Sequence, residues 1–179
     1  MNIRITPTRL HGSVVVPSSK SIGHRELICA ALAQGESVVE NISVSQDIEA
    51  TCRLLQAFGA SIEEIPSAYE GRTAYRVKGG LTKQGEALTV DCGESGSTLR
   101  FLIPIGLYSG NTVVYTGRGQ LVKRPLEPYY RIFDEHGVSY KPTEGGLPLT
   151  VEGCLQPGRY ALAGDVSSQF FTGLLVMLP

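Results

Sequence analysis

Two stretches of the sequence combine hydroxyl side chains, small residues and cations in a pattern suited to holding an anion. The first is Pro17-Ser18-Ser19-Lys20-Ser21 with Arg25, and the second is Gly93-Glu94-Ser95-Gly96-Ser97-Thr98-Leu99-Arg100. Hydroxyl, ammonium and guanidinium groups all donate hydrogen bonds to phosphate and carboxylate oxygens. A serine helix cap beside a solvated lysine and arginine explains the first stretch equally well, because serine caps are common.

Two further stretches carry candidate chemistry. The glycine-containing loop of residues 117–125 holds three cations, Arg118, Lys123 and Arg124, and we interpret it as a mobile loop that grips phosphate or carboxylate; the alternative is a solvated basic loop. The run Asp165-Val166-Ser167-Ser168-Gln169 adds more hydroxyls. Single ionisable residues are given structural interpretations: Asp47 as a helix cap, His24 as packing, and His136 as a partner of a helix C-terminus.

The anion-binding patterns fall where strands give way to helices. The pattern predicts strands at residues 2–6 and 13–16, followed by a helix that begins after residue 19 and ends at Gly35. A strand at 37–42, a second helix at 48–58 and strands at 60–65, 73–78 and 88–91 come next. The order then restarts at Gly93 with an apolar helix, a strand at 111–115, a helix at 125–135 and strands at 138–140 and 149–152. A third start comes at Gly164, before the apolar run 170–178.

The recurrence predicts an internal repeat with a period of roughly 70 to 75 residues, longer than those of solenoids. Units of this kind cover their sheets by packing against one another, which could bring three helix starts together. Helix starts carry unpaired N–H groups and partial positive charge, so their convergence would form an anion site. Three independent helix caps remain the alternative.

Composition restricts the class of protein. With 179 residues and 42% hydrophobic content the chain can bury a core, and its net charge of −1 gives no general attraction for nucleic acid or anionic lipid. No apolar run is long enough to span a bilayer and no signal peptide opens the chain, so we expect a cytoplasmic protein without a membrane partner. Its four cysteines are widely spaced, which favours reduced structural thiols over a metal site.

Taken together, the motifs resemble one family. Pro17-Ser18-Ser19-Lys20-Ser21 with Arg25, the run from Gly93 to Arg100, the pair Arg124-Pro125, and Asp165 to Phe170 occur in the order and spacing of the 5-enolpyruvylshikimate-3-phosphate synthase family (3-phosphoshikimate 1-carboxyvinyltransferases). The resemblance covers essentially the whole chain. It implies a mixed α/β fold made of repeated βαβαββ units of an inside-out α/β barrel.

The same resemblance implies a division into domains. Residues 1–16 would form strands that belong to the other domain of the family. Residues 17–179 would form a substrate-binding domain with two complete repeat units, 17–92 and 93–163, and the start of a third, 164–179. Because family chains are more than twice this length, we expect an N-terminal fragment whose partner is the remaining C-terminal portion.

The resemblance also implies an activity and roles for single residues. The family transfers the enolpyruvyl group of phosphoenolpyruvate to the 5-hydroxyl of shikimate 3-phosphate, in the shikimate pathway to chorismate and the aromatic amino acids, without a metal or organic cofactor. By this resemblance Lys20 would contact both substrates, and Gln169 would lie between them. Shikimate 3-phosphate would be bound by Ser21, Arg25, Ser167 and Ser168. Phosphoenolpyruvate would be bound by Gly96 and Arg124.

Two departures from the family pattern bear on these expectations. Glu94-Ser95 stands where many members have Asn-Ala, which leaves sensitivity to the herbicide glyphosate open. The family's acid/base carboxylates, a further lysine and several arginines lie beyond this chain, and we therefore expect no turnover by the chain alone.

Two other functions stay open. One is the related transferase that acts on UDP-N-acetylglucosamine, which usually has Lys-Asn where this chain has Lys20-Ser21, and a cysteine where it has Gln120-Leu121-Val122. The other is a non-catalytic module that binds phosphorylated metabolites.

Overall fold

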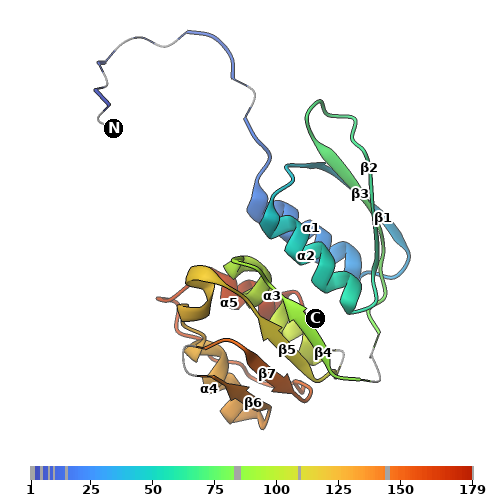
Figure 1. Cartoon of the computed structure of the whole chain (residues 1–179), viewed down its shortest axis with the longest axis vertical. Coiled ribbons are helices and arrows are strands. Elements are labelled where there is room, and N and C mark those ends of the chain that lie inside the picture. The colour runs from blue at the N-terminus through green and yellow to red at the C-terminus, as the bar shows by residue number, and fades with distance from the viewer. Residues whose placement is uncertain are drawn as a thin grey trace.

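The computed structural model describes residues 3–4, 6–7, 9, 11–14, 16–82, 86–108, 110–143 and 146–178. These residues form two successive units, each containing helices and a sheet (Figure 1). The described residues before Lys20 belong to no helix or strand. The strands expected at 2–6 and 13–16 include positions outside the described residues, so they stay predictions.

The first unit packs two helices against an antiparallel sheet of three strands. Figure 1 shows both helices side by side on the same face of this sheet. Alternation along the third strand supports this packing, because Tyr75 and Val77 are buried while Arg76 and Lys78 are exposed. The sheet order is β1-β3-β2. The elements are α1 (Lys20–Leu32), β1 (Glu36–Ile42), α2 (Gln46–Ala57), β2 (Ser61–Pro66) and β3 (Thr73–Lys78).

The second unit repeats this order and adds a strand in front. Its sheet has the order β4-β5-β7-β6, in which β4 and β5 are parallel and the other pairs antiparallel. A parallel pair needs a crossover connection, and a helix provides it here. The elements are β4 (Leu88–Asp91), α3 (Gly96–Tyr108), β5 (Val113–Thr116), the 3₁₀-helix η1 (Gly119–Lys123), α4 (Glu127–His136), β6 (Ser139–Pro142) and β7 (Leu149–Glu152).

The two sheets share one topology. The order β5-β7-β6 in the second unit matches β1-β3-β2 in the first, and in both units a helix separates the first strand from the other two. The last helix, α5 (Ser168–Leu175), stands where a third unit would begin. The predicted mixed α/β fold with a repeated order of elements is therefore confirmed.

The core is centred on α3. Nearly every residue from Thr98 to Leu107 is buried, as expected for a helix enclosed on all sides. α1 and α2 of the first unit pack against α3, β7 of the second unit contacts it, and so does α5, which follows the second unit (Figure 1). Because α1, α2 and α5 all contact α3, their positions are set relative to its start at Gly96.

Candidate functional site

The starts of four helices are closed by serine side chains. Each hydroxyl accepts a hydrogen bond from a backbone N–H two or three residues further on, which satisfies one of the unpaired donors at a helix start. The pairs are Ser19 with Ile22 (3.3 Å), Ser45 with Ile48 (3.3 Å), Ser95 with Thr98 (3.1 Å) and Ser167 with Gln169 (3.3 Å). The interpretation of the first stretch as containing a serine helix cap is therefore correct, and the capping residue is Ser19.

The four helix starts are joined to one another by side-chain contacts. Lys20 Nζ of α1 lies 2.6 Å from Asp47 Oδ2 of α2. Thr98 of α3 contacts the backbone carbonyl of Asp47, with 3.1 Å between the two oxygens. The Gln169 amide of α5 donates to Ser97 Oγ of α3 over 2.8 Å. The starts of α1, α2, α3 and α5 therefore lie next to one another.

Arg25 connects α1 to α5. Its guanidinium donates to the backbone carbonyl of Ser21 (2.7 Å) and to Thr172 Oγ1 of α5 (2.9 Å). It also lies 5.0 Å from the centre of the Phe101 ring of α3, a distance suited to a cation–π contact. These contacts hold the guanidinium in place, and the side chain is only partly buried.

Gly96 and Arg124 are in direct contact. A Cβ atom at position 96 would lie 2.6 Å from a terminal nitrogen of Arg124, so a side chain there would displace the guanidinium from its present place. Arg124 is otherwise exposed to solvent, at the end of the η1 segment. The structure thus brings together two residues that are 28 positions apart in the sequence and that were both predicted for one substrate.

A second arginine, Arg100, lies behind this pair. It is buried with 7% of its surface exposed, donates to Gln169 Oε1 over 2.9 Å, and stacks on the Phe170 ring at 5.0 Å. Burial lowers the pKa of Arg100, and the neighbouring charge of Arg124 lowers it further. In the sequence, Arg100 has no predicted role of its own beyond its place in the second anion-binding stretch. The feature that could have drawn attention to it is a single cation on an otherwise apolar helix.

Two other predicted residues stand at helix starts. Ser21 and Ser168 are exposed in the first turns of α1 and α5. In the 117–125 loop, residues 119–123 form η1 and bury Leu121, while its three cations are exposed; its mobility and anion binding stay predictions. Arg118 of this loop pairs with Asp91 at 3.4 Å. A cavity of about 440 Å³ borders Lys123 and Arg124.

The interpretation of Asp47 as a helix cap is wrong, because Ser45 caps α2 and the Asp47 carboxylate pairs with Lys20. The interpretation of His24 as packing is correct. It is fully buried, its Nδ1 lies 2.8 Å from Thr51 Oγ1, and its ring meets Phe101 edge-on. Burial lowers the pKa of His24 to about 4.

No group of three or more histidine, cysteine, aspartate or glutamate side chains is arranged to hold a metal ion in the part of the chain that the structure describes. No helix among the described residues has the length and apolar content needed to cross a bilayer.

Comparison with known proteins gives a consistent result. The sequence model of EPSP synthase (3-phosphoshikimate 1-carboxyvinyltransferase) matches residues 5–179. Curated proteins named 3-phosphoshikimate 1-carboxyvinyltransferase are similar to 99% of the chain, with 48% identity in Clostridium novyi and 47% in Clostridium kluyveri. The chain spans 42% and 40% of the length of these relatives.

A solved structure of EPSP synthase from Acinetobacter baumannii has the same fold. It aligns with 93% of this chain and 37% of its own length, with a TM-score of 0.76 and 27% sequence identity. The agreement of the sequence family, the curated relatives and the three-dimensional fold leads to one conclusion: the chain belongs to the EPSP synthase family.

Proposed function

We propose that this chain is part of an EPSP synthase and supplies mainly its shikimate 3-phosphate site. In the proposed reaction the 5-hydroxyl oxygen of shikimate 3-phosphate forms a bond to C2 of phosphoenolpyruvate, and inorganic phosphate leaves. The product feeds the synthesis of chorismate and the aromatic amino acids. Family membership supports this proposal, as do the positions of the predicted residues on the joined helix starts.

In this proposal shikimate 3-phosphate is held between α1 and α5. Ser168 offers an exposed hydroxyl at the start of α5, beside the cap Ser167. Ser21 and Arg25 face the same site from α1, and the bond from Arg25 to Thr172 keeps the two helices together. A helix start favours a phosphate group because its N–H groups and its dipole attract negative charge.

Phosphoenolpyruvate is proposed to bind at the start of α3. Arg124 supplies a guanidinium that can hold a carboxylate or phosphate through two parallel bonds, and Gly96 leaves the space in which it lies. Gln169 lies between the two proposed sites, because its side chain joins Ser97 and Arg100. Lys20 stands at the α1–α2 junction, from which it would reach both substrates.

The observation that carries the proposal is a cluster of cations at and beside the joined helix starts. Lys20, Arg25 and Arg100 lie in the first two turns of α1 and α3, and Arg124 contacts Gly96 at the start of α3. Within the described part of the chain, Asp47 is the carboxylate that forms an ion pair with any of them. The chain as a whole has a net charge of −1, so this concentration of cations is local. Two multiply charged anions can be brought together only where such donors are fixed in advance.

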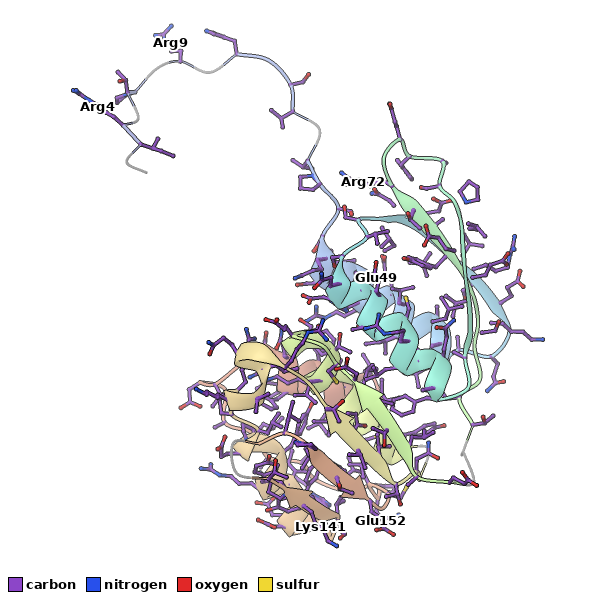
Figure 2. All side chains as sticks on the ribbon, viewed as in Figure 1. Arg4, Arg9, Glu49, Arg72, Lys141 and Glu152 are labelled. Atoms are coloured by element: carbon purple, nitrogen blue, oxygen red, sulfur yellow. The ribbon has the colours of Figure 1, made fainter. Side chains whose placement is uncertain are left out.

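Calorimetric titration of the 179-residue chain with shikimate 3-phosphate tests the proposal. Lys20→Ala and Arg25→Ala should each weaken binding about tenfold or more, since each removes a charged hydrogen bond. Lys141→Ala is the matched control, because Lys141 is exposed on β6 at the far end of the second unit (Figure 2). Thermal unfolding of each variant shows whether a loss of binding reflects a loss of folded protein.

Titrations with UDP-N-acetylglucosamine and with inorganic phosphate separate the alternatives. Preference for the UDP-sugar would support the related transferase, and equal affinity for every phosphate compound would support a module that binds anions generally. Either result would overturn the proposed substrate. The 117–125 loop already argues against the UDP-sugar enzyme, since Leu121 fills its interior and no cysteine is present in it.

A further inference from the structure

A chain of hydrogen-bonded polar side chains runs through the core beneath the helix starts. His24 Nδ1 of α1 lies 2.8 Å from Thr51 Oγ1 of α2, which lies 2.8 Å from Thr98 Oγ1 of α3, which lies 2.7 Å from Ser95 Oγ. None of these four side chains is more than 1% exposed. Thr98 Oγ1 also lies 3.1 Å from the backbone carbonyl oxygen of Asp47.

Thr98 is the donor at the centre of this chain. Its single hydroxyl proton has two acceptors within reach, Ser95 Oγ and the backbone carbonyl of Asp47. Thr51 can donate to Thr98, and neutral His24 can donate from Nδ1 to Thr51. Ser95 also accepts from the backbone N–H of Thr98. The Thr98 hydroxyl therefore links the start of α3 to the backbone of α2.

The two ends of this chain lie next to the two halves of the proposed site. Thr98 holds the backbone of Asp47, whose carboxylate pairs with Lys20. Ser95 directly precedes Gly96, where Arg124 approaches. Thr98 is thus the point through which the Lys20 side and the Arg124 side are connected inside the protein.

Apolar residues could fill this space without the cost of burying polar groups. Hydrogen bonds differ from apolar contacts in that they fix both distance and direction, and a fully satisfied buried network specifies one arrangement of the elements around it. Three helices meet here, and an error of about 1 Å in a substrate-binding arrangement can cost a factor on the order of a hundred in rate.

We propose that Thr98, supported by Thr51, His24 and Ser95, is a positioning residue that sets the distance between Lys20 and the Gly96–Arg124 pair. This inference rests on the proposed function, because it assigns the network a purpose in substrate binding. Thr98 itself lies in the core and touches no substrate in the proposal.

The test uses three variants of the 179-residue chain. Thr98→Val keeps the shape and removes the hydroxyl, while Thr98→Ser keeps the hydroxyl. Tyr115→Phe is the matched control, since the buried Tyr115 hydroxyl donates to the Leu102 carbonyl over 3.0 Å within the body of α3. Thr51→Val is a milder second variant in case Thr98→Val does not fold, because it leaves the Asp47 and Ser95 contacts in place.

Binding of shikimate 3-phosphate is the first readout. Thr98→Val should bind about tenfold more weakly, Thr98→Ser should recover most of the affinity, and Tyr115→Phe should bind normally although it also loses a buried hydrogen bond. An equal loss in Thr98→Val and Tyr115→Phe would make Thr98 a residue of general stability and overturn the inference.

Amide hydrogen exchange without ligand is the second readout, and it is independent of the proposed function. The amides to follow are those of Glu49 and Leu99, which donate to the backbone carbonyls of Ser45 and Ser95 in the first turns of α2 and α3. Thr98→Val should speed exchange at both amides more than Tyr115→Phe does. Unchanged exchange at both amides would overturn the inference. If the unsubstituted chain binds no shikimate 3-phosphate, the proposed function fails, and the exchange result alone decides whether the network fixes the helix starts.

Discussion

The imidazole of His24 is buried among groups that favour its neutral form. Nδ1 has Thr51 as its partner, while Nε2 has no partner among the described residues, so a second ring proton would be buried without an acceptor. Burial is the main cause that lowers the pKa of His24 to about 4; Lys20 and Arg25 lower it as well, and Asp47 opposes them. The buried site therefore favours the uncharged form of His24.

This pKa makes stability depend on pH in a defined direction. His24 takes up a proton near pH 6.5 in the unfolded chain but only near pH 4 in the folded chain. The free energy of unfolding therefore decreases as the pH falls from 6.5 to 4. A shift of this size corresponds to about 3 kcal/mol. Urea unfolding at pH 7.0 and pH 4.5 should show a smaller loss in His24→Asn than in the unsubstituted chain, since asparagine cannot take up the proton.

The same substitution at His11, which is exposed, is the control and should keep the full loss because His24 is unchanged. Identical pH dependence in His24→Asn and the unsubstituted chain would show that His24 is not the group responsible. Carboxylates that titrate in this range contribute equally to all three proteins, so the difference between them isolates the histidine.

Candidate residues can be named from the sequence where the chemistry is local. Lys20, Arg25, Gly96 and Arg124 stand in motifs whose residue types are compatible with anion binding, and their individual roles stay predictions. Thr98 and Arg100 could not be assigned in this way, because their partners Thr51 and Gln169 are 47 and 69 positions away in the sequence. A threonine or an arginine on an apolar helix acquires a role only when folding supplies its partner.

At the scale of elements, α5 approaches α3 closely through a glycine. A Cβ atom at Gly173 would lie 2.6 Å from the backbone carbonyl oxygen of Arg100 and would also strike the Tyr129 hydroxyl, which donates to that carbonyl. Because one obstacle is backbone, a side chain can be accommodated only if α5 moves. This close approach also holds Gln169 and Arg100 within hydrogen-bonding distance.

Gly173→Ala should therefore destabilise the fold by about 1 to 3 kcal/mol, the usual cost of overpacking. Helix propensity alone predicts the opposite sign, because alanine stabilises a helix by about 1 kcal/mol relative to glycine. Gly164→Ala is the matched control, as nothing lies within 4 Å of its Cβ position. Urea unfolding of both variants decides the matter, and a stabilised Gly173→Ala protein would contradict the close packing of α5 on α3.

The helices and longer strands were predictable from the sequence because their patterns are periodic. The strands at 73–78, 88–91 and 149–152 have the predicted bounds, and the other described elements shift by one to a few residues. The η1 segment was not predicted, since a short 3₁₀-helix has i→i+3 bonds and leaves no 3.6-residue pattern. Which helices share a core was also beyond the sequence pattern, because the burial of α3 on all sides depends on both units.

For the whole molecule, the repeat explains how a chain of net charge −1 gathers cations in one place. Each unit places a helix ahead of its first repeated strand, and packing the units around α3 sets the starts of these helices side by side. Glycine and serine at these starts leave room for the guanidinium groups and satisfy the backbone. The charge pattern is therefore a consequence of topology and does not require a basic composition.

The last prediction separates binding from turnover. The 179-residue chain should bind shikimate 3-phosphate yet release no phosphate when phosphoenolpyruvate is added. Enolpyruvyl transfer needs a proton donor and acceptor at the reacting atoms, whereas here the Asp47 carboxylate is held by Lys20 and the His24 imidazole is enclosed in the core. Calorimetry and a phosphate-release assay on the same sample measure both properties.

Fusion to the rest of the Clostridium novyi relative, of which this chain matches 42%, should supply the groups that are needed and restore phosphate release. In that fusion Lys20→Ala should lower the rate, while Lys141→Ala, on the exposed edge strand β6, should leave it unchanged. Phosphate release by the chain alone, above the rate in buffer, would mean that proton transfer uses residues already present, and Asp47 would then be the first carboxylate to substitute.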